Sequence, residues 1–197
     1  MNIRRIGIAG YMGAGKTVAA QLLSSAAGPA GAGADVIDAD FEAKMIMSDD
    51  PGIRDRLVRA FGDSIFENDR LSFRSLGGIV FTSKEKLLQL NSIVHPPLEK
   101  RLRGLLEAHQ GRSVILDAAV LPLWNMATLF DTCLWIHAPF EQRLERLKKI
   151  RRDLDTRTLR ERMRVQEDCL PAPPCPPWRL VHNDGSKEQL AGVICIL

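Results

Sequence analysis

Short apolar runs recur along the chain, each bounded by glycine, proline or charged residues, and they predict five β-strands. The first run is apolar at nearly every position, which is typical of a central strand that is covered on both faces. The other runs have the length of buried strands in a parallel sheet. The expected strands cover residues 3–9, 34–38, 113–118, 132–137 and 179–182.

Stretches with the periodicity of amphipathic helices separate these strands. A helix is predicted from Gly15 to about Ala27, followed by a loop at 28–33 that is too rich in glycine and proline for regular structure. A last helix, capped by Ser186, is expected to bury Leu190, Val193 and Ile194. Two further helices are expected at 140–150 and 157–165, and a short helix or turn at 122–129.

The region between the second and third strands is almost entirely helical. Helices are predicted over 41–47, 51–61, 73–81 and 84–90, with Gly62 ending the second and a polar turn at 67–70. His95-Pro96-Pro97 is expected to break the chain and to start a long helix that runs to about His109. We therefore expect a helical insert at about 46–110, within a core formed by 1–45 and 111–197.

The alternation of strand and helix from the first residues predicts an α/β fold, in which helices flank a parallel sheet. We find no internal repeat. The length of 197 residues suits one such domain, 1–197, with a small helical insert.

One motif has a specific chemical meaning, because residues 10–17 read G-x-x-x-x-G-K-T between the first strand and the first helix. This is the phosphate-binding loop, or P-loop, of nucleoside triphosphate sites. Its glycines let backbone N–H groups point at phosphates, while Lys16 reaches the β- and γ-phosphates and Thr17 offers a hydroxyl to Mg²⁺. A chance glycine-rich turn would leave this order of elements unexplained. The residues expected to bind ATP here are Gly10, Met12, Gly13, Ala14, Gly15, Lys16, Thr17 and Val18.

Acidic residues end two predicted strands, at the sheet edge where ligands of open parallel sheets lie. Asp38 and Asp40 share one face of an extended segment after the second strand. Asp40 can also be interpreted as the N-cap of the following helix, and both interpretations can hold together. Asp117 ends the third strand, as a magnesium-binding aspartate would, although many strands end in aspartate. Thr17 and Asp117 are thus the expected ligands of Mg²⁺.

Basic residues are concentrated between 143 and 152, where two interpretations stay open. They form either a solvated face or a mobile lid, at about 146–160, whose arginines close over the triphosphate. Arg74 and His95 also have more than one interpretation. A lone arginine is usually a surface group and a histidine before proline usually a packing or capping residue, but an arginine can also clamp an anionic substrate.

Composition excludes several classes of protein. Hydrophobic residues make up 45% of the chain and charged residues 26%, an ordinary globular balance, and a net charge of +3 does not argue for nucleic acid. Without a long apolar run or a leader, we expect a cytoplasmic protein that does not bind membranes. Cys133, Cys169, Cys175 and Cys195 form no C-x-x-C pair, so reduced thiols are expected rather than disulfides or metal ligands.

Several stretches together resemble the dephospho-coenzyme A kinase family, in the family's order and over nearly the whole chain. They are GYMGAGKT, VIDAD, the FG at 61–62, DRLSFRSLGGIVF, the L-x-x-I-V-H-P segment ending at Pro96, and VHNDG. The P-loop alone would indicate only the superfamily, whereas VIDAD with LSFRSLGGIVF and VHP is far more specific. The resemblance implies a P-loop kinase fold with a helical substrate-binding insert and a lid. It also implies transfer of phosphate from ATP to the ribose 3′-hydroxyl of dephospho-coenzyme A, the last step of coenzyme A synthesis.

The resemblance also implies roles for single residues. Asp40, the second aspartate of VIDAD, corresponds to the catalytic base, and Lys16 to the residue that acts on the transferred phosphate. The catalytic lid arginine is expected at Arg151 or Arg152. The other implied site residues are Arg74 and His95 on the substrate side, and Asn183 and Gly185 in the loop beside the adenine.

The chain departs from the family's pattern in three places. The family usually has P-L-L-x-E after the third strand, where this chain reads AAVLPLWNM and lacks the acidic residue. The glycine-rich loop before VIDAD is longer than usual. The P-loop ends in Lys-Thr rather than Lys-Ser, which keeps the hydroxyl.

Other classes of function remain open. One is a P-loop kinase for a nucleoside monophosphate or a small alcohol, and another is a nucleotide-dependent switch, although the N-K-x-D of guanine-specific switches is absent. An inactive homologue is a further alternative. The presence of Lys16, Thr17 and Asp40 argues against it. The expected partner is a small-molecule substrate, and the expected state is a monomer or a weak homo-oligomer.

Overall fold

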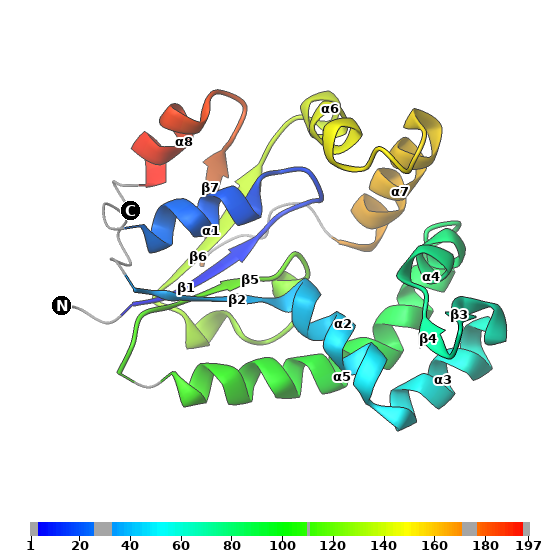
Figure 1. Ribbon diagram of the computed structural model, residues 1–197. Coiled ribbons are helices and arrows are strands. Elements are labelled where there is room, and N and C mark those ends of the chain that lie inside the picture. The colour runs from blue at the N-terminus through cyan, green and yellow to red at the C-terminus, as the bar shows by residue number, and fades with distance from the viewer. Residues whose placement is uncertain (1–3, 26–32, 110, 171–176, 195–197) are drawn as a thin grey trace.

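The computed structural model describes residues 4–25, 33–109, 111–170 and 177–194. At its centre lies a sheet with strand order β2-β5-β1-β6-β7 (Figure 1), in which every neighbouring pair is parallel. The predicted α/β class with a parallel sheet is therefore confirmed. The strands are β1 (Arg5–Ala9), β2 (Asp35–Asp38), β5 (Val114–Asp117), β6 (Thr132–His137) and β7 (Trp178–His182).

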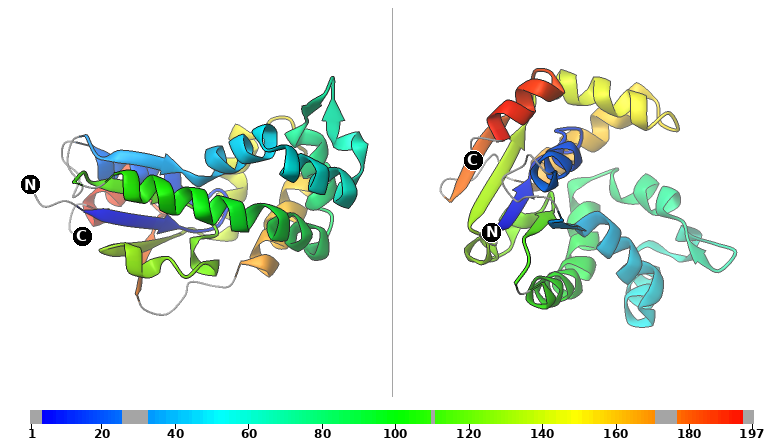
Figure 2. Two further views of the ribbon diagram at one scale, coloured as in Figure 1. Left: turned by 90° about the horizontal axis from the view of Figure 1, so that it is seen from below. Right: turned by 60° about the vertical axis from the view of Figure 1, so that its left-hand side comes forward.

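Helices cover both faces of this sheet (Figure 2), because successive side chains of each strand point to opposite sides. Ile8 of β1 packs in a core with α1 and α8, whereas Ala9 belongs to a second core on the face that α5 covers. This two-sided burial explains why the first strand is apolar from Ile6 to Ala9. The helices are α1 (Lys16–Ser24), α2 (Ala39–Asp49), α3 (Pro51–Phe61), α4 (Phe73–Val80), α5 (Lys84–Ala108), α6 (Phe140–Ile150), α7 (Thr156–Cys169) and α8 (Lys187–Ile194).

Helices α3 and α4 project beyond the carboxyl ends of the strands, together with a small hairpin (Figure 1). The hairpin pairs β3 (Phe66–Glu67) with β4 (Arg70–Leu71), where the sequence had indicated only a polar turn. Asn68 and Asp69 join the strands with φ of 50° and 64°. Two central residues with positive φ match the twist of paired strands, which is why this turn produces a hairpin.

The predicted break at His95-Pro96-Pro97 is wrong, because α5 runs without interruption from Lys84 to Ala108 with both prolines inside. A proline inside a helix removes an N–H and leaves a carbonyl four residues earlier without its partner. For Pro96 that carbonyl belongs to Ser92, and Nη2 of Arg56 in α3 donates to it at 3.3 Å. The packing of α3 against α5 thus compensates part of the cost of the prolines.

Smaller differences have local causes. Ser186 and Gln189 exchange hydrogen bonds at the start of α8, as the predicted cap requires, but Val193 is 45% exposed because only Leu190 and Ile194 face the sheet. The segment 122–129 contains two 3-10 helices, Leu121–Leu123 and Ala127–Leu129, in place of one short helix.

The glycine-rich loop at 28–32, most of the proline-rich loop at 171–176, and the thiols of Cys175 and Cys195 lie outside the described residues. Cys133 and Cys169 are free thiols, as expected. No helix in the described part of the chain is both long enough and apolar enough to cross a membrane.

Candidate active site

The P-loop occupies the turn between β1 and α1, and its shape depends on glycine at two close approaches. Gly10 has a φ of 143°, and a Cβ there would lie 2.3 Å from the carbonyl oxygen of Ile136. Gly15 has a φ of 97°, and a Cβ there would lie 2.2 Å from Nδ2 of Asn183. No other residue type fits these positions without moving β6 or the segment after β7, so the sequence motif and the local structure agree.

Thr17 and Asp117 come together at the start of α1, as their places in the sequence had predicted. The Thr17 hydroxyl donates to Oδ2 of Asp117 at 3.1 Å. Burial raises the pKa of the Asp117 carboxyl, while Lys16 and the Thr17 hydrogen bond oppose that rise. Two oxygen ligands next to a lysine suit a cation that is shared with phosphate groups. Within the described residues no group of three or more His, Cys, Asp and Glu forms a metal site by itself.

The two aspartates after β2 have different positions. Oδ1 of Asp38 accepts from the backbone N–H groups of Asp40 and Phe41, at 2.9 and 3.1 Å, so Asp38 is the N-cap of α2. The interpretation of Asp40 as the N-cap is therefore wrong, because the helix begins two residues earlier than the apolar pattern suggested. The Asp40 carboxylate is left exposed at the wall of a pocket.

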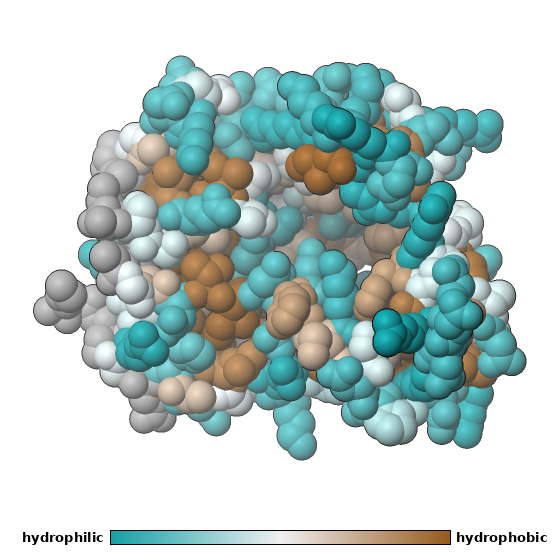
Figure 3. Space-filling view, viewed as in Figure 1, coloured by the Kyte–Doolittle hydropathy of each residue, from teal (hydrophilic) through white to brown (hydrophobic). Residues whose placement is uncertain are grey.

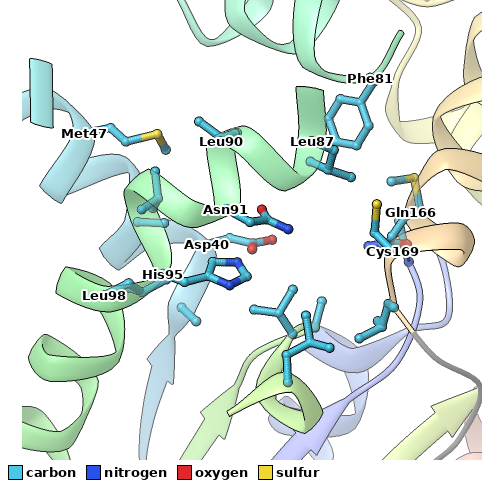
Figure 4. A pocket seen from close by; sticks show the side chains of 18 of the residues that line it. Asp40, Met47, Phe81, Leu87, Leu90, Asn91, His95, Leu98, Gln166 and Cys169 are labelled. Carbon is cyan, nitrogen blue, oxygen red and sulfur yellow. Dashed lines mark hydrogen bonds between the residues drawn. The ribbon is translucent and has the colours of Figure 1, made fainter. Parts of the chain in front are cut away.

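This pocket, of about 290 Å³, lies between the P-loop, α2, α5 and α7. The face in Figure 3 is hollowed near its centre, where hydrophobic side chains line much of the depression. Figure 4 shows Asp40, Asn91 and His95 pointing into the same space, with Gln166 and Cys169 facing them from α7. Much of the wall is apolar and comes from Ala43, Met47, Phe81, Leu87, Leu90, Val94, Leu98, Val120, Leu123 and Leu170.

His95 is one of the polar groups in this mainly apolar wall. Its ring packs edge-to-face on Trp124, with centroids 5.3 Å apart. Burial lowers the pKa of His95 to about 4, and the nearby Glu99 opposes that effect only partly. The imidazole is therefore neutral at physiological pH, with one nitrogen that donates and one that accepts.

The basic residues of α6 do not form a uniform solvated face. Arg143 is only 2% exposed, and it donates to the carbonyls of Ala138 and Met12 and pairs with Glu167 of α7. Arg146 donates to the carbonyls of Gly13 and Ala14 at 3.4 and 3.3 Å. Two of the basic side chains thus bind the P-loop backbone, and the description of the run as solvated is wrong for them.

The segment after β7 supports the same loop. Nδ2 of Asn183 donates to the carbonyl of Ala14 at 2.7 Å. The backbone carbonyl of Asn183 accepts from Nη2 of Arg146, also at 2.7 Å. Asn183 is only 7% exposed. Gly185 lies two residues further, in the turn before α8, where a Cβ would lie 1.9 Å from Oε1 of Gln189. These residues fix the shape of the P-loop and of the turn beside it.

Helix α7 contacts the P-loop from the other side. Oε1 of Gln166 accepts the backbone N–H of Met12 at 2.7 Å, and the Tyr11 hydroxyl donates to the carbonyl of Leu170 at 3.2 Å. Gln166 therefore links the pocket wall, the P-loop and α7. Nothing in the local sequence pattern around Gln166 signals this contact.

The arginines expected to act from the lid lie in the turn between α6 and α7. Arg151 forms two hydrogen bonds of 3.0 Å to the carboxylate of Asp153. Arg152 is exposed, and so is Arg74 on α4. The positive charge of Arg74 is among the effects that hold the pKa of Asp153 down at about 2, although the Arg151 hydrogen bond contributes most.

Three features of the pocket were not foreseen from the sequence. Asn91 faces the pocket one helical turn before His95, a spacing that could have identified it once α5 was known to be continuous. Gln166 and Cys169 also line it. The segment that lacks the family's acidic residue contributes Val120 and Leu123 instead, which makes this wall apolar.

Known proteins resemble this chain over most of its length. A dephospho-CoA kinase family model matches residues 4–169. A dephospho-CoA kinase from Thermobifida fusca is 29% identical over 94% of this chain and 90% of its own length. The structure of TT1252 from Thermus thermophilus superposes with a TM-score of 0.65 at 28% identity, covering 96% of this chain and 93% of that one. A dephospho-CoA kinase structure from Campylobacter jejuni shares the fold, with a TM-score of 0.60 at 16% identity. The superposition covers 98% of this chain and 93% of that one. With the P-loop kinase fold and a family match over most of its length, this chain belongs to the dephospho-CoA kinase family.

Proposed function

We propose that this protein transfers the γ-phosphoryl group of ATP to the ribose 3′-hydroxyl of dephospho-coenzyme A, giving coenzyme A and ADP. The observation that carries the proposal is the position of Asp40, whose free carboxylate shares one pocket with Lys16 of the P-loop. The pocket is mainly apolar, as the site of an acceptor with a base and an aliphatic arm requires. Family membership then favours dephospho-coenzyme A over other alcohols.

The P-loop would hold the triphosphate. Phosphoryl transfer depends on positioning and on neutralising charge more than on covalent help from the protein. Backbone N–H groups of Gly13 and of residues 15–17 at the start of α1 supply donors and partial positive charge. Lys16 would contact the phosphoryl group that moves.

Mg²⁺ fits the oxygen pair formed by Thr17 and Asp117, which already lie 3.1 Å apart. Mg²⁺ usually takes one or two protein oxygens and completes its shell with phosphates and water. When bound, it would neutralise charge on the β- and γ-phosphates. Asp117 would need to be ionised to bind Mg²⁺, and the positive charge of Lys16 favours the ionised form.

Asp40 would act as the general base. It would accept a hydrogen bond from the 3′-hydroxyl, orient the oxygen toward the γ-phosphorus and take its proton. The Asp38 cap fixes the first turn of α2 and so fixes the backbone of Asp40. His95 and Asn91, on the adjacent face of α5, would flank the ribose as neutral hydrogen-bonding groups.

The helices at about 46–110 would bind the acceptor, and the segment at about 146–160 would act as a lid. Arg74 lies on the insert and Arg151 and Arg152 on the lid, so closure would bring positive charge toward the phosphates from both sides. Arg152 has an exposed side chain that could move onto the transferred phosphoryl group. Closure would also exclude water and limit hydrolysis of ATP. A cytoplasmic location and a monomeric or weakly oligomeric state remain part of the proposal on the sequence alone.

A coupled assay of ADP release tests the proposal. Dephospho-coenzyme A is compared with adenosine, a nucleoside monophosphate, pantetheine and small alcohols as acceptors, with ATP and Mg²⁺ in excess. We expect turnover with dephospho-coenzyme A and a product that migrates with coenzyme A. Preference for a nucleoside monophosphate or a sugar would replace the proposed acceptor, and slow turnover with every acceptor would favour a nucleotide-dependent switch or an inactive homologue.

A further inference from the structure

Arg162 of α7 carries a partly buried positive charge at the junction of α7 and α4. Its guanidinium carbon lies 5.2 Å from the centre of the Phe81 ring. A Cβ on Gly77 would lie 3.5 Å from its Nη1, so the guanidinium also packs against the backbone of α4. The absence of a side chain at Gly77 leaves the space that this arginine occupies.

No carboxylate or carbonyl among the described residues accepts a hydrogen bond from Arg162. Burial lowers its pKa, and the positive charge of Arg151 lowers it further, with only Asp153 acting in the opposite direction. Asp153 already forms two hydrogen bonds to Arg151. Glu161, which lines a second, separate depression together with Gly77, Phe81 and Arg162, pairs with Arg157.

A partly buried guanidinium that no protein acceptor engages keeps N–H donors available to water or to a bound anion. Arginine presents a planar fork of N–H donors that matches phosphate oxygens. Arg74 of α4 and Arg151 add positive charge in the same region, since both act on the carboxylate of Asp153. The place is therefore suited to a phosphate ester or a diphosphate.

The contacts of Arg162 lie on the acceptor side of the site. It packs against Gly77 of α4 and against Phe81, the residue that ends this helix. Phe81 also lines the pocket that contains Asp40 (Figure 4). A ligand whose ribose hydroxyl reaches Asp40 could pass the Phe81 ring and present a phosphate group to the Arg162 fork.

We propose that Arg162 is a binding residue for the diphosphate of the acceptor, at a subsite between α4 and α7 walled by Phe81 and Gly77. The inference rests on the proposed function for the identity of the acceptor. Arg162 discriminates acceptors that carry a diphosphate from nucleosides that lack one. Phe81 holds the guanidinium in place by a cation–π contact while the subsite is empty.

Binding measurements test this without relying on turnover. A non-hydrolysable ATP analogue saturates the P-loop, and dephospho-coenzyme A or adenosine is then titrated by calorimetry. In Arg162→Gln we expect affinity for dephospho-coenzyme A to fall about 10- to 100-fold, as for a lost charged hydrogen bond. Affinity for adenosine should change less than about twofold, because it has no group to place there.

The matched control is Arg164→Gln, which removes the same charge from an exposed position two residues along α7. It should bind both ligands as the wild type does. Arg162→Lys keeps a charge near Phe81 and should recover part of the affinity for dephospho-coenzyme A. If the glutamine variant fails to fold, the lysine variant replaces it in the comparison with the wild type.

If Arg162→Gln lowers the affinities for dephospho-coenzyme A and adenosine equally, Arg162 has a packing role and the proposal is overturned. Weaker binding of the ATP analogue with unchanged acceptor affinity would also overturn it, because Arg162 would then belong to the triphosphate. If the wild type binds dephospho-coenzyme A in an Arg162-dependent way but does not phosphorylate it, the subsite stands and the proposed function fails.

Discussion

The backbone N–H of Met12 donates to Oε1 of Gln166 at 2.7 Å, so the last turn of α7 holds the P-loop directly. The same helix end binds the loop through the pair of Glu167 with Arg143, whose guanidinium also reaches the carbonyl of Met12. Both polar groups of one P-loop residue are therefore satisfied from α6 and α7. Any movement of α7 that accompanies lid closure would act on the loop that holds the phosphates.

Replacing Gln166 by alanine should weaken ATP binding. The Met12 N–H would lose its acceptor, at a cost of about 1–3 kcal/mol where the group is shielded from water. Because the loop must keep its shape to bind phosphates, we expect the affinity for an ATP analogue to fall about tenfold. Gln166→Glu keeps an acceptor oxygen and should recover most of it. The control is Gln142→Ala, whose amide donates to the carbonyl of Asp184 and, among the described residues, makes no hydrogen bond to residues 10–17. Equal effects of the two alanine variants would refute the link to the loop.

Lys16→Ala should nearly abolish phosphoryl transfer without unfolding the protein. Lys16 lines the pocket, so its loss removes charge from the site and not apolar area from the core. Losing one clamp on a transferring phosphate typically costs about 10²-fold or more in rate. Single-turnover assays and a melting curve check both parts. Lys148→Ala, on an exposed lysine paired with Glu145, is the control. Near-normal turnover in Lys16→Ala would mean that the P-loop does not hold the reacting phosphate.

The separate positions of Asp38 and Asp40 predict opposite results for their variants. Asp40→Asn keeps the shape but cannot take a proton, so turnover should fall by about 10²- to 10⁴-fold with little change in stability. Asp38→Ala removes the N-cap of α2 and should cost about 1 kcal/mol of stability. Turnover and melting temperature are measured for both variants. Full activity in Asp40→Asn would remove it from the mechanism and leave Asp38 or Asp117 as the next base to test.

The sequence predicted the parts of the fold that depend on neighbouring residues. The three central strands β1, β5 and β6 could be found because they are buried on both faces, and the P-loop because its glycines permit a local shape. Distant contacts decide the elements that were missed. The continuity of α5 through Pro96 is supported by Arg56, which lies forty residues earlier and supplies a donor to the carbonyl of Ser92. Proline statistics alone favour a break there.

The same limit applies to the site. Charge density in 143–152 could not separate Arg143, which is buried beneath the P-loop, from Arg152, which is exposed. Burial of an arginine depends on acceptors that come from other elements, here Ala138, Met12 and Glu167. Charge density therefore marked the basic segment but could not assign a task to each of its arginines.

The turn between α6 and α7 should be cleaved by trypsin without nucleotide and protected with it. Ile150 is 73% exposed at the end of α6, and Arg152 two residues later is exposed. Closure over a triphosphate would bury this turn. Limited proteolysis with and without a non-hydrolysable ATP analogue measures the difference at Arg152. Equal cleavage in both states would return the segment to a solvated loop.

His95 should make the protein less stable as the solution becomes acidic. Its pKa in the folded state is about 4, against an ordinary value of 6.5. Between these values the unfolded chain binds a proton that the folded protein does not, so stability falls as the pH drops through this window and is unaffected above it. From pH 7.5 to pH 5 the loss that His95 causes should be about 2 kcal/mol. His95→Gln removes the titration, and the other acid-sensitive groups are the same in both proteins. Chemical denaturation of the wild type and the variant at the two pH values gives the difference. If the variant loses as much stability as the wild type, the imidazole is not held neutral by burial against Trp124, and its assignment as a neutral partner of the acceptor ribose would have to be abandoned.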